Sequence, residues 1–88
     1  MVRRTHRADH NQAEIVKALK RIGCDVRPIG RPVDLLVGYR KANFLLEIKN
    51  PDGSYTGTES QKEFLESWRG QVDVVHTVEQ AIRIVTQG

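Results

Sequence analysis

The sequence is poor in cysteine and in aromatic residues, and it has no long apolar run. Cys24 is the one cysteine among 88 residues, so no intramolecular disulfide can form and an intracellular location is favoured over a secreted one. The longest apolar runs, such as Leu35-Leu36-Val37, are far shorter than a membrane-spanning helix, which needs about 20 residues. No apolar stretch follows the arginines near the first residue, as a secretory signal would require. We therefore expect a cytoplasmic protein without a membrane segment.

Length and composition are typical of one small folded domain. Hydrophobic residues make up 39% of the chain and charged residues 28%, which is the balance of a globular protein rather than a disordered one. A chain of 88 residues is too short for two ordinary domains and forms only a thin core. We expect one domain over residues 1–88, and the thin core makes self-association physically reasonable.

Positive charge is concentrated in the first part of the chain. Residues 1–49 hold 11 of the 14 Lys and Arg residues and 5 of the 11 Asp and Glu residues. One face or end of the domain should therefore be basic. Residues 1–9 contain Arg3, Arg4 and Arg7 and are expected to form a flexible basic arm that contacts phosphates. The alternative is a solvated, frayed terminus.

Apolar spacing predicts three helices and four strands. The i, i+3, i+4, i+7 spacing that starts at Ile15 predicts a helix that Gly23 ends, and Thr77 can cap the last helix. Pro28 favours an edge position for the first strand, since proline cannot donate to a ladder. The expected helices cover residues 11–22, 59–69 and 78–85, and the expected strands cover 24–29, 33–38, 43–49 and 72–76. This α-β-β-β-α-β-α order predicts a single α/β domain in which helices flank a mixed sheet.

The second and third strands are predicted to form a hairpin in which two carboxylates face each other. Strand alternation puts Glu47 and Lys49 on one face of the strand. If the turn is centred between Arg40 and Lys41, antiparallel pairing places Asp34 opposite Glu47. Opposed residues have Cβ atoms about 5 Å apart, where two like charges repel unless a cation lies between them. The register therefore predicts a cation site.

Oxygen ligands of this kind suit Mg²⁺ or Mn²⁺. Mg²⁺ takes oxygen ligands in octahedral geometry and retains several waters, so two carboxylates can suffice. A bound metal polarises a phosphodiester and activates water, while an ammonium such as that of Lys49 orients the water or stabilises developing charge. These parts together predict hydrolysis of a phosphodiester bond.

The spacing of these residues resembles a known nuclease superfamily. Asp34 followed by Glu47-Ile48-Lys49 is similar to the PD-(D/E)xK pattern, and the segment from Gly30 to Leu36 resembles the virus-type replication-repair nuclease (VRR-NUC) group. The resemblance covers about residues 12–76. Val33 is a departure, because the commoner form of the group has proline directly followed by aspartate.

The resemblance implies both a fold and a set of site residues. It implies a restriction-endonuclease-like core, a metal held by Asp34, Glu47 and the Ile48 carbonyl, and catalytic assistance from Lys49. It also implies that an early helix supplies Glu14. The helix after the hairpin would supply Gln61. Small members of this kind often act as homodimers on branched DNA. A viral member would act inside the host cell.

Glu14 and Gln61 each have a plainer interpretation as capping residues. Asn11 and Glu14 have the spacing of a capping box, as do Thr58 and Gln61. We favour a supporting role in the site for both Glu14 and Gln61, because each lies at the edge of an apolar helical stripe.

Three further features need a choice between structural and functional interpretations. Arg31 precedes the proposed site and is expected to hold a phosphate. His6 and His10 are four residues apart, but no third zinc ligand is evident. Trp68 shares a helical face with Phe64 and is expected to be a core residue rather than a base-stacking platform.

The sequence thus predicts a Mg²⁺- or Mn²⁺-dependent DNA endonuclease that selects branched or junction DNA. Two alternatives stay open, namely a non-catalytic nucleic-acid-binding module and a nuclease subunit that a partner chain completes.

Overall fold

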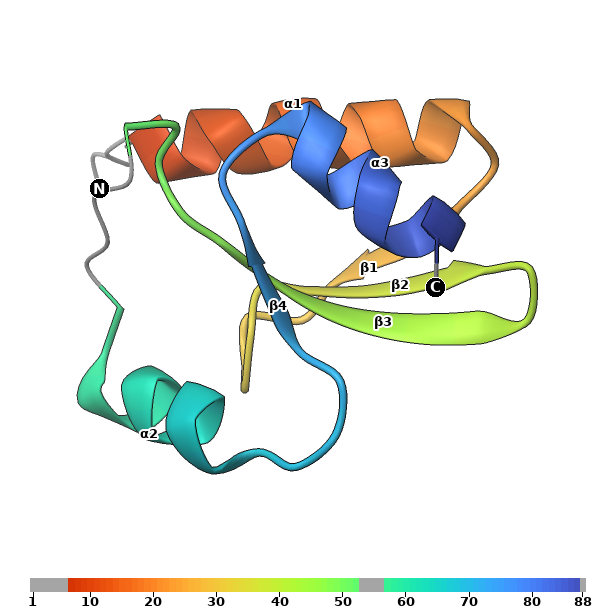
Figure 1. The fold of residues 1–88 in the computed structure, drawn as a ribbon. Helices are drawn as coiled ribbons and strands as arrows, with labels where there is room; N and C mark the ends of the chain where they lie inside the picture. The colour runs from red at the N-terminus through yellow and green to blue at the C-terminus, as the bar shows by residue number, and fades with distance from the viewer. Residues whose placement is uncertain (1–6, 53–56, 88) are drawn as a thin grey trace.

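The computed structural model describes residues 7–52 and 57–87, with side chains from His10 onward. Two helices lie on one side of a sheet and a third lies on the other (Figure 1). The elements are α1 (Arg7–Arg21), β1 (Asp25–Pro28), β2 (Leu35–Tyr39), β3 (Ala42–Ile48), α2 (Glu59–Ser67), β4 (Asp73–Val75) and α3 (Val78–Gln87). This order and the mixed sheet confirm the predicted α/β fold.

The sheet has the strand order β1-β2-β3-β4. The first three strands are antiparallel neighbours and β4 runs parallel to β3. A parallel pair needs a crossover, and the segment that contains α2 supplies it. Pro28 is the last residue of β1, which is an edge strand as predicted.

The core lies between the sheet and the pair α1 and α3. These two helices contact each other and the sheet, whereas α2 contributes no buried residue. Along β3 the apolar side chains alternate toward α1 and α3, so every second residue belongs to the core. The core cluster is Ile15, Leu19, Cys24, Val26, Leu35, Val37, Phe44, Leu46, Ile48, Val75, Ala81 and Val85.

Cys24 is a packing residue of this core. Its side chain is buried, and burial together with the charge of Asp25 raises the pKa of its thiol. The thiol therefore stays protonated at neutral pH and is poorly reactive. Gly23 separates α1 from β1 with a φ of 103°, which supports the predicted helix stop.

The hairpin turn fixes the register that the sequence predicts. Arg40 and Lys41 occupy the turn, with φ values of 52° and 68°. Tyr39 pairs with Ala42 and Leu35 pairs with Leu46, so the predicted register is confirmed. Two positive φ angles define a type I′ turn, which normally carries Asn-Gly. Two long side chains in this conformation cost roughly 1–2 kcal/mol per residue.

Two predictions about helices differ from the structure. Helix α1 begins at Arg7, before residue 11, because the apolar stripe that guided the prediction starts only at Ile15. Trp68 is 48% exposed and follows the last residue of α2, so the expectation that it is a core residue is wrong. It stacks instead on Phe64, with ring centroids 5.0 Å apart. No helix in residues 7–52 and 57–87 is long and apolar enough to cross a membrane.

Candidate active site

At the open end of the hairpin, the side chains of Asp34 and Glu47 each accept a hydrogen bond from the backbone at or beside the other residue. The Asp34 backbone N–H donates to Glu47 Oε1 at 3.2 Å, and the Ile48 N–H donates to Asp34 Oδ2 at 2.8 Å. Asp34 comes directly before β2, opposite Glu47 when the observed register is extended by one residue. The two side chains therefore continue the ladder where backbone pairing stops. Each carboxylate is oriented by a charge-assisted hydrogen bond.

Glu47 is the one buried charged or polar residue among the residues that the structure describes. It is 2% exposed and lies between Leu46 and Ile48, which belong to the core. Alternation directs Glu47 to the opposite face of the sheet, the side on which Figure 1 shows α2. Burial of a carboxylate is costly unless a charge or hydrogen bond compensates for it. An apolar residue would be the ordinary choice at this position, which makes Glu47 a candidate site residue.

The loop before Asp34 is fixed by one buried side chain and by the Asp34 carbonyl. That carbonyl accepts hydrogen bonds from the N–H groups of Ile29 at 2.9 Å and Gly30 at 3.4 Å. Val33 is fully buried. The residue that departs from the commoner VRR-NUC pattern therefore anchors the backbone next to Asp34. Arg31 is exposed in the same loop, where a phosphate could reach it.

Lys49 and His76 are neighbours at the ends of two parallel strands. Ile48 pairs with Val75, and the Lys49 N–H donates to the Val75 carbonyl at 2.9 Å. Side chains in register on parallel strands point to the same face. Lys49 and His76 therefore lie side by side on the face of the sheet that carries Glu47. Both are half-buried. The position of His76 was missed from sequence, because the pairing of β3 with β4 is not local.

A hydrogen bond from α3 orients the His76 ring. Gln80 Oε1 accepts from the His76 backbone N–H at 2.6 Å and lies 3.3 Å from ring Nδ1. A backbone N–H can only donate, so this atom is the amide oxygen, and Nδ1 must carry the hydrogen to bond with it. The Gln80 N–H in turn donates to Thr77 Oγ1 at 3.1 Å, as the predicted cap of this helix requires.

Asn11 joins α1 to both of these strand ends. Its Nδ2 donates to the Lys49 carbonyl at 2.7 Å and to the His76 carbonyl at 2.8 Å. Because α1 begins at Arg7, Asn11 lies in the helix interior, and the interpretation of Asn11 and Glu14 as an N-terminal capping box is wrong. The amide uses both hydrogens of one nitrogen to hold the backbone of Lys49 and His76 together. Sequence reasoning missed this contact.

The two supporting residues lie in different environments. Glu14 is exposed on α1. Gln61 caps α2, since Thr58 N–H donates to Gln61 Oε1 at 2.9 Å and Gln61 N–H donates to Thr58 Oγ1 at 3.2 Å. The capping-box interpretation of Gln61 is therefore confirmed. A supporting role of Glu14 or Gln61 in the site stays a prediction.

The donor set fits a hard cation that keeps water ligands. Within the described part of the chain, no three His, Cys, Asp or Glu side chains form a group that could hold a metal. Backbone carbonyls and water would therefore have to complete the shell of a cation held by Asp34 and Glu47. Mg²⁺ usually binds through one or two carboxylates and retains waters, so the residues fit this ion. Zinc, which prefers four nitrogen or sulfur ligands, does not fit.

The predicted phosphate-binding residues are only partly covered by the structure. Arg3 and Arg4 lie outside the described residues. Arg7 is the first residue of α1, so residues 7–9 are helical rather than part of a flexible arm. Arg31 lies three residues before Asp34 and is exposed.

Comparison with solved structures identifies the fold. One solved structure, described as a VRR_NUC domain, superposes with a TM-score of 0.71 at 22% sequence identity, covering 93% of this chain and 97% of that chain. No family model matches the sequence, and no curated protein matches it. The chain therefore has the fold of a VRR_NUC domain, as the resemblance implied.

We expect Asn11→Ala to destabilise the protein, because it leaves the carbonyls of Lys49 and His76 without their shared donor. The loss should be about 1–3 kcal/mol in the free energy of unfolding, measured by urea denaturation. Asn43→Ala is the matched control, since Asn43 is exposed on β3 far from this end. Equal stability of the two variants would contradict the contribution of Asn11.

Proposed function

We propose that the chain is a Mg²⁺- or Mn²⁺-dependent DNA endonuclease that hydrolyses phosphodiester bonds and prefers branched or junction DNA. The observation that carries the proposal is the pair of hydrogen bonds around the buried Glu47. The Glu47 carboxylate accepts from the Asp34 N–H, and the Asp34 carboxylate accepts from the Ile48 N–H, next to Glu47. Two fixed carboxylates beside Lys49 are the parts that metal-assisted hydrolysis needs. The VRR_NUC fold supports this choice of reaction class.

Asp34 and Glu47 would hold the cation, with the Ile48 carbonyl as a further ligand. When bound, the cation polarises the phosphodiester and lowers the pKa of a bound water. Lys49 follows Glu47 on the same face and places an ammonium beside the reacting phosphate. There it orients the attacking water and stabilises the negative charge that develops on the phosphoryl oxygens. Asn11 fixes the backbone of Lys49, so the ammonium starts from a defined position.

DNA would be held by four arginines, one in the loop before Asp34 and three near the start of the sequence. Arg31 adjoins the site, and Arg3, Arg4 and Arg7 come from the start of the sequence. Contacts of this kind are electrostatic and independent of base sequence. A preference for DNA shape rather than sequence follows, because the proposed contacts reach the backbone only.

Cleavage tests the proposal against the alternative of a non-catalytic binding module. With Mg²⁺ or Mn²⁺, the wild type should cut four-way junction or flap DNA, and Asp34→Asn and Lys49→Ala should each lower the rate by about 100-fold or more. Asp25→Asn and Lys20→Ala are matched controls, exposed and outside the site.

The controls should cut like the wild type. Binding without cleavage by the wild type would favour the non-catalytic module, whereas cleavage that appears only after a second chain is added would favour the subunit alternative. Equal rates in all variants would remove the proposed mechanism.

Metal binding can be measured without DNA. Ca²⁺, Mg²⁺ or Mn²⁺ at 100 times its dissociation constant should raise the free energy of unfolding by about 2.7 kcal/mol, since the ion binds the folded state. The increase should vanish in Glu47→Gln and persist in Asp25→Asn. Thermal unfolding with and without metal provides the measurement. An equal increase in both variants would place the metal elsewhere.

We also propose that the protein acts as a homodimer, so that two sites cut two strands. Within residues 10–52 and 57–87, three large apolar side chains are exposed, namely Ile29, Leu36 and Trp68. The core of a chain this short is thin, and burial of such residues between two copies would add stability.

Sedimentation tests the dimer. The wild type should sediment at twice the chain mass of 10.0 kDa, and Trp68→Ser should shift the equilibrium toward the monomer, because the exposed indole is removed. Arg69→Ser is the control, since Arg69 is the exposed neighbour of Trp68. A monomeric wild type at micromolar concentration would rule the homodimer out.

A further inference from the structure

The hairpin tip, defined as Tyr39, Arg40 and Lys41, combines two unusual features. Both turn residues are non-glycine residues in the left-handed region, with φ values of 52° and 68°. Both also carry long cationic side chains that are exposed. The type I′ turn would be more stable with Asn-Gly. A local choice that opposes stability points to a role for the side chains themselves.

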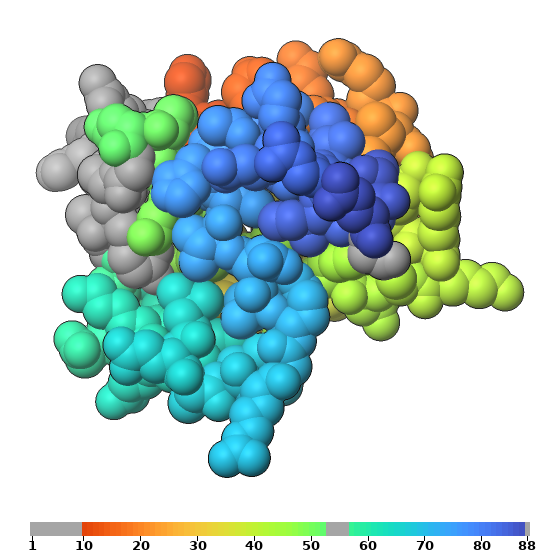
Figure 2. Space-filling view, viewed as in Figure 1, coloured from red at the N-terminus to blue at the C-terminus, as the bar shows by residue number. Residues whose placement is uncertain are grey.

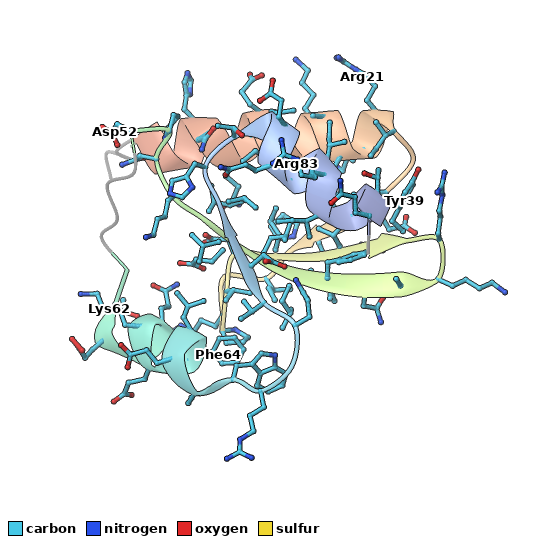
Figure 3. The ribbon with its side chains drawn as sticks, viewed as in Figure 1. Arg21, Tyr39, Asp52, Lys62, Phe64 and Arg83 are labelled. Carbon is cyan, nitrogen blue, oxygen red and sulfur yellow. The ribbon has the colours of Figure 1, made fainter. Side chains whose placement is uncertain are left out.

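The tip projects from the molecule. In Figure 2 the yellow-green segment around the turn extends beyond the neighbouring helices at one side of the molecule. Figure 3 places Tyr39 at the opposite side of the view from Asp52, which comes shortly after Lys49 in the chain. The tip and the proposed site therefore lie at the two ends of the β2–β3 hairpin. Arg40 comes six positions after Asp34 along the strand, a span of about 20 Å.

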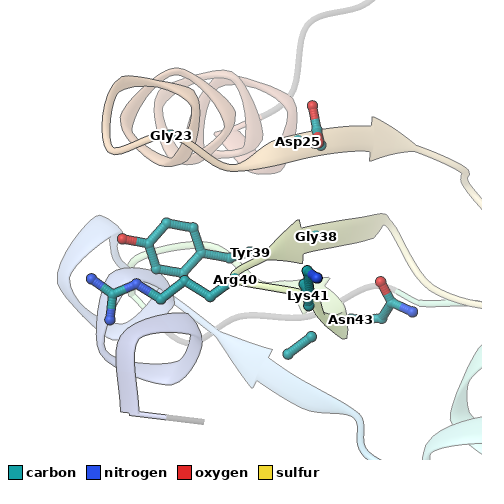
Figure 4. A pocket seen from close by; sticks show the side chains of 8 residues that line it. Gly23, Asp25, Gly38, Tyr39, Arg40, Lys41 and Asn43 are labelled. Carbon is teal, nitrogen blue, oxygen red and sulfur yellow. The ribbon is translucent and has the colours of Figure 1, made fainter.

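The exposed Arg40 side chain contacts an aromatic ring. Its guanidinium lies over the Tyr39 ring, 5.0 Å from the centroid. Such a cation–π contact restricts the side chain before any ligand binds. Figure 4 shows this pair beside a shallow hollow of about 270 Å³, which Lys41 and Asn43 also line. Asp25 is the one carboxylate among the lining residues, so the tip as a whole keeps a positive charge.

The face between the two ends carries a further cation. Arg27 pairs with Leu36, and both are exposed on the face opposite the core. This is the face of Glu47, because Val26 and Val37 point into the core instead. Asp25 lies on this face too and nearer the tip, since it pairs with Gly38.

Tyr39 is in step with Val37 and packs against the core, so the Arg40 guanidinium over its ring lies at the tip on the side of α1 and α3. Lys41 is exposed beside it, and the two cations meet at the end of the hairpin rather than on one face of the sheet.

We propose that Arg40 and Lys41 form a second phosphate-binding point for a duplex arm of the nucleic acid whose backbone is cut at the other end of the hairpin. The inference rests on the proposed function. A span of about 20 Å corresponds to about six base pairs at a rise of 3.4 Å. The rigid ladder of β2 and β3 fixes that spacing, so the tip contacts the arm about six base pairs from the scissile phosphate. The contact is electrostatic and sequence-independent.

The double variant Arg40→Asn/Lys41→Gly separates this role from folding. It removes both charges and installs the residues that the turn prefers, so its Tm should rise by several degrees. The control Lys17→Gln/Arg83→Gln also removes two charges. Both residues are exposed, on α1 and α3, which lie on the side of the sheet opposite Glu47. Figure 3 shows Arg83 on α3.

The experiment measures affinity for four-way junctions with Ca²⁺ in place of Mg²⁺. One junction has arms of about 14 base pairs, and the other has arms of about 4 base pairs closed by loops so that they stay paired. On the long arms the hairpin variant should bind on the order of tenfold more weakly than the control, with a salt slope smaller by about 1.8, because each phosphate contact contributes about 0.9. On the short arms the two proteins should bind equally, since the DNA cannot reach the tip.

Each other outcome overturns a different statement. Equal affinity of the hairpin variant and the control for the long arms would overturn the second binding point. An equal loss of affinity on the long and the short arms would overturn the proposed distance between the second binding point and the site. Wild-type protein that binds neither junction would overturn the proposed function and this inference together. Binding without cleavage by the wild type would leave the second binding point standing and remove the nuclease activity.

Discussion

The register of the β2–β3 hairpin is the constraint on which the site depends. A slip of one residue would turn every side chain of β3 to the other face. Glu47 would then enter the core, and Leu46 and Ile48 would leave it. The two-residue turn at Arg40 and Lys41 prevents this slip, because it sets which residues face each other along the whole ladder. The position of the carboxylates is therefore determined at the far end of the hairpin.

The buried carboxylate explains the dense hydrogen bonding around this end of the sheet. Glu47 accepts a backbone N–H from Asp34, and Asp34 accepts one from Ile48. These bonds offset part of the cost of burying charge. Asn11 adds a contact from α1 to the ends of β3 and β4. The site is thus held by segments that lie far apart in the sequence, and its geometry requires the complete fold.

Local features of the fold could be predicted from sequence, and contacts between distant segments could not. The hairpin register followed from the turn position alone, so Asp34 could be placed opposite Glu47. The Thr58 and Gln61 cap also followed from a four-residue pattern. Asn11 and His76 depend on how α1 and β4 meet the end of β3, which no local pattern encodes. Their side-chain types gave no signal, since an interior helical asparagine resembles a cap.

Trp68 shows where apolar spacing misleads. Its distance from Phe64 is that of one helical face, but α2 ends at Ser67 and contributes nothing to the core. The crossover from β3 to β4 needs length and direction rather than a buried face, so its helix can keep apolar residues at the surface. Trp68 is the exposed example, and it packs on Phe64 at the surface instead of in the core. The proposed contacts of Trp68 with a second copy, and of the tip cations with a phosphate backbone, would each compensate for a local choice that lowers the stability of the isolated domain.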